Sequence, residues 1–344
     1  MSHVKSIFVT LALAVGVHSI VASFMHSPNE PTLSPESTSP ALSAVVAPLE
    51  ESKQTSEPVT RKFTKAMLHD SRRKLDLVFC VDTTSSMQGE IDTVKSTVKK
   101  MVSQLSTLQK AQVRVGLVAY RDIGDDYVTK VFPFASDIDK VVHDISGLEA
   151  QGGGDGPESV EKGLHSALYE LSWDKDKETA KLLFLIGDAP PHDNVDWKKE
   201  CAAAVEHGIQ INTIGCEGIQ DYGSDGVPMF KKVAAMTNGN YQALTYHQEI
   251  ADKSGKVHTF VSSAGSAYEV KPEARDEWSA GGEALVANGK AVALQGATNG
   301  TIGPQGADAT YVTGVNTAGT VRSDNNLGSV IVNTAGTALD RLRK

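Results

Sequence analysis

The chain has only three cysteines in 344 residues, which excludes the disulfide framework that holds small secreted domains together. It also has fewer basic than acidic residues, 33 against 42, and a formal net charge of −9. This balance argues against a nucleic-acid partner and against electrostatic binding to anionic lipid. The hydrophobic content of 40% is nevertheless sufficient for one large α/β domain with additional segments.

The chain also lacks a long apolar run. Its N-terminal apolar stretch, residues 7–21, is too short for a comfortable membrane span and follows Lys5, which is typical of a secretory signal. We predict a signal peptide or N-terminal membrane anchor at residues 1–23; cleavage before Phe24 and retention as an anchor are both open. No cysteine lies directly after this segment, which argues against a lipoprotein.

Residues 28–58 are rich in Pro, Ser, Thr and Glu and have few large apolar side chains, so we predict a disordered linker over residues 24–73. A signal followed by a tether predicts an exported protein, located in the periplasm or cell envelope or secreted.

A buried strand that ends in an acid is the most informative feature of the sequence. Residues 75–81 form a nearly continuous apolar run, which fits a central parallel strand buried on both faces. Asp82 follows at once, and Thr84 and Ser86 add two hydroxyl groups. Ligands of open α/β sheets bind at the carboxyl ends of the strands, and hard oxygen donors favour Mg²⁺, Ca²⁺ or Mn²⁺ over zinc. The alternative is that these three side chains only cap the helix that begins near residue 88.

Two further loops carry acids towards the same edge. Residues 182–186 form another apolar strand, which ends in Gly187-Asp188 and continues into a Pro-Pro-His turn. Between the two strands lies the glycine-rich segment QGGGDGPE at residues 151–158, which contains Asp155. The sequence therefore predicts one site built from three loops.

Apolar periodicity predicts the remaining elements. We expect helices at residues 88–108, 138–145, 159–171, 197–207, 229–236 and 248–261, and further strands at residues 113–119, 127–134, 209–214 and 241–244. This alternation predicts the α/β class, with a doubly wound, mostly parallel sheet flanked by helices on both sides.

The three loops, in this order, resemble the von Willebrand factor A family over residues 74–265, in particular its bacterial exported members. The metal-ion-dependent adhesion site of that family uses an Asp-x-Ser-x-Ser loop, a threonine from a second loop and an aspartate from a third. In this chain Asp82, Thr84 and Ser86 match the first loop and Asp188 matches the third. The resemblance implies that they hold a divalent cation, with Mg²⁺ the first choice and Ca²⁺ or Mn²⁺ the alternatives.

The second loop departs from the family pattern. Where a threonine is expected, the chain has Gly154 next to Asp155. The resemblance therefore implies that Asp155 is a substitute metal ligand, either directly or through a water molecule.

Three other residues near this edge have two open interpretations. Arg121 and Asp122 end the strand at residues 113–119 and either contact the ligand or the metal ligands, or form an ion pair of Arg121 with Asp122 or Asp125 that shapes the hairpin. His192 either faces the metal or is an exposed loop residue.

Two of the cysteines lie close to the same edge in the predicted fold. Cys201 lies early in a helix and Cys216 at the end of the following strand, so we expect them to form a disulfide in an oxidising compartment.

The composition of residues 266–344 shifts to Gly, Ala, Thr, Asn and Val. Short strands at residues 291–294, 309–312 and 328–332 would make this segment a small β appendage, and a loosely ordered tail is the alternative.

These features predict a non-enzymatic, divalent-cation-dependent protein-binding module. The cation leaves one coordination position open, and a carboxylate of a partner protein completes it; an additional acid at Asp155 would weaken that attraction. The alternative is a metal-assisted hydrolase or phosphotransferase that uses Asp82, Asp188 and His192. Against it, the segment after Asp82 lacks the second aspartate of Asp-x-Asp phosphotransferases, and the glycine loop lacks the Lys-Ser/Thr of a P-loop. We therefore predict no enzymatic activity.

Overall fold

The computed structural model describes residues 73–108, 111–154, 156–263, 265–294 and 317–342. All of these residues belong to one unit of the chain, residues 63–344. The predicted signal or anchor lies outside the described residues, as does all of the predicted linker except its last residue. No helix in the described part combines the length and the apolar character needed to cross a membrane.

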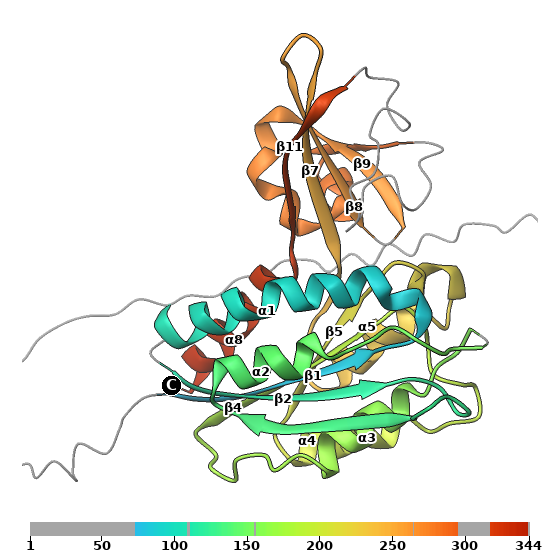
Figure 1. Cartoon of the computed structure of the whole chain (residues 1–344), viewed down its shortest axis with the longest axis vertical. Coiled ribbons are helices and arrows are strands. Elements are labelled where there is room, and N and C mark those ends of the chain that lie inside the picture. Colours follow the sequence, from blue (N-terminus) through green and yellow to red (C-terminus); the bar gives the residue numbers. More distant parts are fainter. Residues whose placement is uncertain (1–72, 109–110, 155, 264, 295–316, 343–344) are drawn as a thin grey trace, which may run out of the picture. The chain divides into compact units, whose positions relative to one another are not determined.

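Six strands form the main sheet, in the order β3-β2-β1-β4-β5-β6 (Figure 1). They are β1 (Lys74–Asp82), β2 (Gln112–Tyr120), β3 (Thr129–Ala135), β4 (Thr179–Gly187), β5 (Gln210–Gly215) and β6 (Tyr241–Ala243). All neighbouring pairs are parallel except β2 and β3, which confirms the predicted mostly parallel sheet. β1 is buried from its second residue to its last, as its continuous apolar sequence predicts.

Helices cover both faces of this sheet (Figure 1). One face packs against α1 (Gln88–Leu108), α2 (Ile138–Ser146) and α8 (Leu327–Arg341), and the other against α3 (Val160–Tyr169), α4 (Lys198–Glu206) and α5 (Val227–Met236). The predicted helix at residues 88–108 is α1, and its buried residues Ile91, Val98 and Leu105 recur at helical spacing. Two short 3₁₀ helices, η1 (Ser85–Met87) and η2 (Ile219–Tyr222), lie in the loops at the carboxyl edge.

The register of the sheet determines where the acids lie. β1 pairs in parallel with β4, and Val81 stands beside Ile186. Both strands therefore end at the same edge, Asp82 being the last residue of β1 and Asp188 the first residue after β4. This arrangement is the one that the sequence predicts.

A second sheet follows β6 and has the order β10-β9-β8-β7-β11. Its strands are β7 (Thr245–Asp252), β8 (Val257–Ser263), β9 (Ser266–Val270), β10 (Ala291–Ala293) and β11 (Thr317–Asn325), accompanied by η3 (Pro272–Ala280) and α6 (Gly282–Ala287). All of its pairs are antiparallel. The predicted strand at residues 291–294 is β10, and the one predicted at residues 309–312 lies outside the described residues.

The helix that we predicted at residues 248–261 is wrong, because this segment is the hairpin of β7 and β8. A tight turn separates the two strands: Asp252 Oδ1 accepts hydrogen bonds from the backbone of Ser254 and Lys256, and Gly255 has a φ of +84°. The alternating β-branched residues of β8 then favour extended backbone.

The strand that we predicted at residues 328–332 is also wrong, because these residues are part of α8. The local sequence Gly-Ser-Val-Ile-Val favours a strand. However, Leu327, Ile331, Ala335 and Leu339 lie four residues apart and are all buried in the core that α1 and β4 also line. Packing against the main sheet therefore decides in favour of the helix.

Candidate metal centre

Asp82 is fully buried at the end of β1, and only one of its carboxylate oxygens is paired. Its Oδ1 atom accepts hydrogen bonds from the backbone N–H of Thr84 at 2.9 Å and from Thr84 Oγ1 at 2.7 Å. Its Oδ2 atom has no hydrogen-bond partner in the described residues. Thr84 occupies the N-cap position of η1 but makes no capping hydrogen bond with its side chain.

Asp188 brings a second carboxylate to the same place. It is buried, and its Oδ1 atom has no partner among the residues described. Burial raises the pKa of Asp188, and a hydrogen bond with Ser86 partly offsets that rise. Burial, and next the charge of Asp188, raises the pKa of Asp82 to about 8. The structure thus brings together the aspartates and the hydroxyls of Thr84 and Ser86, whose oxygens are 3.4 Å apart.

The glycine-rich loop packs directly on the Asp82 loop. The N–H of Gln151 donates to Thr83 O at 3.0 Å, and the N–H and Oγ of Ser85 donate to Gly152 O at 3.2 and 2.8 Å. Gly153 has a φ of +72°, and a Cβ atom there would stand 3.0 Å from Thr84 Cβ, so glycine permits this close approach. Asp155, the predicted substitute ligand, lies outside the described residues.

Glu158 is a candidate site residue that the sequence argument missed, since it named only Asp155 as a metal ligand in the glycine-rich segment. It is 3% exposed, and its Oε2 atom has no hydrogen-bond partner in the part of the chain that the structure describes. Burial, followed by the charges of Asp82 and Asp122, raises its pKa to about 9. Its position between a glycine loop and the start of α3 was the available signal, but no sequence pattern shows that the side chain is buried.

A shallow pocket of about 200 Å³ opens above these groups. Thr84, Ser86, Gly153, Glu158 and Tyr222 are among its lining residues. The hydroxyl of Tyr120 is also buried without a partner among the described residues.

The donor set fits a hard divalent cation. Buried carboxylate oxygens without partners are energetically costly, and a cation would compensate them. Asp82, Asp188 and Glu158 each have such an oxygen. Among the described residues no group of three or more His, Cys, Asp or Glu side chains is arranged to hold a metal. A cation at this place would therefore depend on the hydroxyls as well as on the acids.

Comparison with known proteins agrees with this architecture. The family model of the von Willebrand factor A domain matches residues 76–262, more than half of the chain. The chain belongs to the von Willebrand factor A family.

Two relatives are similar to parts of this von Willebrand factor A protein. A putative ariadne-like RING finger protein of Acanthamoeba polyphaga mimivirus is 29% identical over 154 residues, and the alpha-protein kinase vwkA of Dictyostelium discoideum is 30% identical over 122 residues. The matches cover 44% and 34% of this chain but only 14% and 19% of those proteins.

The solved structures that match part of this chain include the pilus adhesin SpaC of Lactobacillus rhamnosus GG in its open conformation. The TM-score is 0.41 at 13% identity, covering 53% of this chain and 32% of that one. The protein BatB of Bacteroides thetaiotaomicron has a TM-score of 0.39 at 15% identity, covering 49% of this chain and 89% of that one.

Arg121 makes hydrogen bonds to two loops of the von Willebrand factor A domain. Its guanidinium donates to the carbonyl oxygens of Thr83 at 3.2 Å and Glu149 at 2.9 Å, and it lies 4.2 Å from the ring centre of Tyr127. The ion pair with Asp122 or Asp125, one of our two interpretations, is not formed between these residues. Arg121 instead connects the first loop to the segment that leads into the glycine loop.

Asp122 and His192 form a pair beside the pocket. Asp122 Oδ1 accepts hydrogen bonds from Ser159 Oγ at 2.9 Å and from His192 Nε2 at 2.8 Å. Burial acts to raise the pKa of Asp122, but the hydrogen bond from His192 and those from the backbone of Ile123 and from Ser159 outweigh it and hold the pKa below its usual value. His192 thus joins the loop after β4 to the loop after β2.

The predicted disulfide between Cys201 and Cys216 is wrong. All three cysteines are free and buried. Cys201 lies in the core that α3, α4 and α5 cover, whereas Cys216 lies in the core on the α1 face. The sheet separates the two thiols, although Cys201 lies early in α4 and Cys216 directly follows β5.

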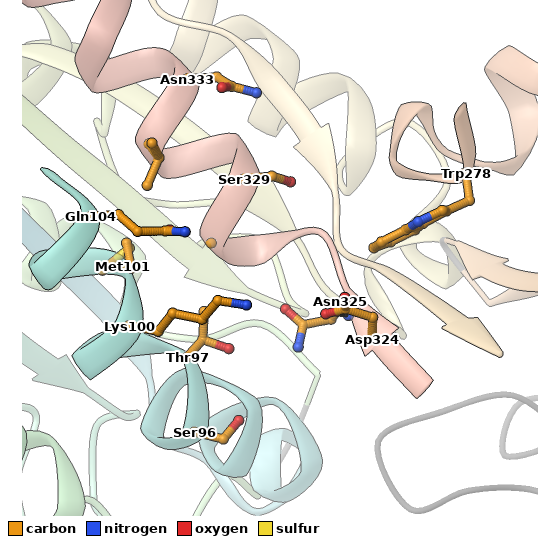
Figure 2. Close-up of a pocket in the computed structure, with 12 residues that line it drawn as sticks. Ser96, Thr97, Lys100, Met101, Gln104, Trp278, Asp324, Asn325, Ser329 and Asn333 are labelled. Carbon is orange, nitrogen blue, oxygen red and sulfur yellow. Dashed lines mark hydrogen bonds between the residues drawn. The ribbon is translucent and has the colours of Figure 1, made fainter. Parts of the chain in front are cut away.

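A second pocket, of about 470 Å³, lies away from the candidate metal centre. Figure 2 shows that α1 contributes residues such as Lys100 and Gln104, α8 contributes Ser329 and Asn333, and Trp278 closes one side. None of the predicted site residues lines it.

Proposed function

We propose that this von Willebrand factor A protein is a non-enzymatic protein-binding module that depends on a divalent cation. Asp82, Thr84, Ser86 and Asp188 would hold the cation, with Asp155 as a further ligand in place of the family's threonine. The cation would supply a positively charged coordination position that a partner's oxygen atom can fill. Mg²⁺ is our first choice, followed by Ca²⁺ and Mn²⁺.

One observation carries this proposal. Three carboxylate oxygens, from Asp82, Asp188 and Glu158, are buried at the carboxyl edge of the sheet without partners among the described residues. Burial opposes the ionisation of all three acids and raises their pKa values, and the charges of neighbouring acids raise those of Asp82 and Glu158 further. A bound cation compensates both the unpartnered carboxylate oxygens and the unfavourable ionisation of the acids, whereas the unliganded protein would retain these two costs.

Calorimetric titration of the full-length chain, after treatment with a chelator, tests the cation. We expect saturable binding of at least one of Mg²⁺, Mn²⁺ and Ca²⁺, and its loss in Asp82→Asn. Asp139→Asn is the matched control, because Asp139 lies on α2 with a side chain that is 86% exposed. Absence of binding in the wild-type chain would overturn the proposal.

A carboxylate is the partner group that we propose. An array of acidic peptides, probed with the protein in the presence of the cation, should give signals that EDTA removes and that Asp82→Asn does not show. Signals that persist in EDTA would contradict a contact made through the cation.

We further propose that the protein is exported, on the basis of the apolar N-terminal segment and the linker. N-terminal sequencing of the protein from its native cell distinguishes the two forms. A start near Phe24 would establish cleavage, and an intact N-terminus in a membrane fraction would establish an anchor. An intact N-terminus in the cytosol would contradict export.

A further inference from the structure

Glu158 is a buried acid whose backbone is held firmly at the candidate metal centre. Its N–H donates to Pro190 O at 2.9 Å, and it forms an isolated β-bridge with Pro191. The loop after β4, which carries Asp188, thereby positions Glu158 as well. At 3% exposure the side chain has almost no access to solvent that could solvate its charge.

The side chain lies against the Asp82 loop. A Cβ atom on Gly153 would stand 2.9 Å from Glu158 Oε1 and 3.0 Å from Thr84 Cβ, so both groups border the same small space. Glu158 also lines the pocket that Thr84 and Ser86 line. Its Oε2 atom has no partner among the described residues, although buried carboxylates normally accept hydrogen bonds.

Without a cation this position is unfavourable. Burial, followed by the charges of Asp82, Asp122 and Asp188, acts against ionisation of Glu158. No positively charged side chain forms an ion pair with Glu158 in the described part of the chain. A cation that binds close to Glu158 would compensate its charge, and this would explain why the chain keeps a buried, unpaired carboxylate among other acids.

The contact with a cation need not be direct. The described residues contain no group of three acidic, histidine or cysteine side chains arranged to bind one ion. Mg²⁺ and related hard cations keep several of their water molecules, and carboxylates that accept hydrogen bonds from bound water tune the affinity of the site.

We infer that Glu158 is a third carboxylate of the cation site, which binds the cation through a coordinated water molecule and sets its affinity. This inference rests on the proposed cation-binding function. Asp82, Asp188 and Glu158 together carry more negative charge than a divalent cation neutralises. Glu158 therefore also lowers the positive potential that a partner's carboxylate meets. It acts as a positioning residue for the coordinated water molecule and not as a direct ligand of the cation.

Titration of the full-length Glu158→Gln variant with Mn²⁺, Mg²⁺ and Ca²⁺ tests the inference. We expect a loss of affinity of about 10-fold to 100-fold, which is typical for removal of an outer-shell partner. Glu161→Gln is the matched control: Glu161 is also buried and also has an unpartnered Oε2 atom, but it does not line the pocket. This control should bind the cations as the wild type does.

Thermal unfolding in EDTA separates this role from a structural one. Glu158→Gln should unfold at the same temperature as the wild type or at a higher one, because the variant removes a buried unpaired acid. A clearly lower temperature would assign Glu158 a structural role and overturn the inference. If the wild type binds the cations and Glu158→Gln binds them with the same affinity, the inference is overturned but the proposed function is not. If the wild type binds no cation, both are overturned.

Discussion

Replacement of Asp82 by asparagine should have opposite effects on the free energy of unfolding with and without a cation. Burial and the charge of Asp188 raise the pKa of Asp82 from 3.8 to about 8. Between these two pH values the folded state binds more protons than the unfolded state, so the free energy of unfolding of the cation-free protein falls as pH rises. Asparagine is neutral at every pH, and the variant should lose this dependence.

The magnitude follows from the size of the pKa difference. Each unit corresponds to about 1.4 kcal/mol, so the full difference amounts to several kcal/mol. Asparagine, however, also leaves a buried amide group to be paired, which costs about 1–3 kcal/mol. We therefore expect Asp82→Asn to stabilise the cation-free protein by about 2 kcal/mol at pH 8, or roughly 4–8 °C in the unfolding temperature. At pH 5 the gain should disappear, because the wild type has then lost only about 1–2 kcal/mol through this linkage, which the cost of the buried amide offsets.

The assay is denaturant and thermal unfolding in EDTA at pH 5 and pH 8, repeated with a saturating cation at pH 8. A cation at 100 times its dissociation constant should stabilise the wild type by about 2.7 kcal/mol and leave Asp82→Asn unchanged. Asp139→Asn, on the exposed surface of α2, should behave as the wild type throughout. The reasoning is refuted if Asp82→Asn is less stable than the wild type at pH 8 in EDTA and the cation stabilises both proteins equally.

Three further predictions concern the surroundings of the site and the core. Gly187→Ala should destabilise the protein by about 1–3 kcal/mol, because its Cβ would stand 2.5 Å from the hydroxyl oxygen of Tyr120. Adding Tyr120→Phe should restore part of the lost stability, as measured by urea unfolding. If it restores none, the clash with the Tyr120 hydroxyl is contradicted. Ile331→Ala in α8 should cost about 2–5 kcal/mol, since Ile331 is fully buried, whereas Asn333→Ala on the exposed side should cost little; equal unfolding midpoints for the two variants would argue against α8 as part of the core. The three buried thiols should resist iodoacetamide in the native protein and should all be alkylated after unfolding without reductant. Burial, and next the charge of Glu200, raises the pKa of Cys201 to about 12, and burial raises the pKa of Cys80 and of Cys216 as well. Mass spectrometry that finds two unreactive thiols after unfolding would reveal a disulfide.

Local sequence was sufficient wherever one segment decides its own structure. The apolar run before Asp82 predicted β1, and the spacing of apolar residues predicted α1 with its observed bounds. The position of an acid directly after a buried strand predicted the edge at which the candidate site lies. Such patterns reflect backbone geometry, since a buried parallel strand needs apolar residues on both faces and a packed helix needs a stripe on one. Whether Asp155 is a ligand and which cation binds stay predictions.

The tertiary structure decided what depends on neighbours remote in sequence. Residues 248–261 and 328–332 have sequences that fit more than one periodicity, and their packing partners selected the hairpin and α8. The two cysteines of the predicted disulfide were separated by the sheet, which sequence spacing does not reveal. The buried position of Glu158 emerged in the same way. Burial is a property of the assembled fold, and an acid becomes costly and informative only when distant loops close around it without a partner.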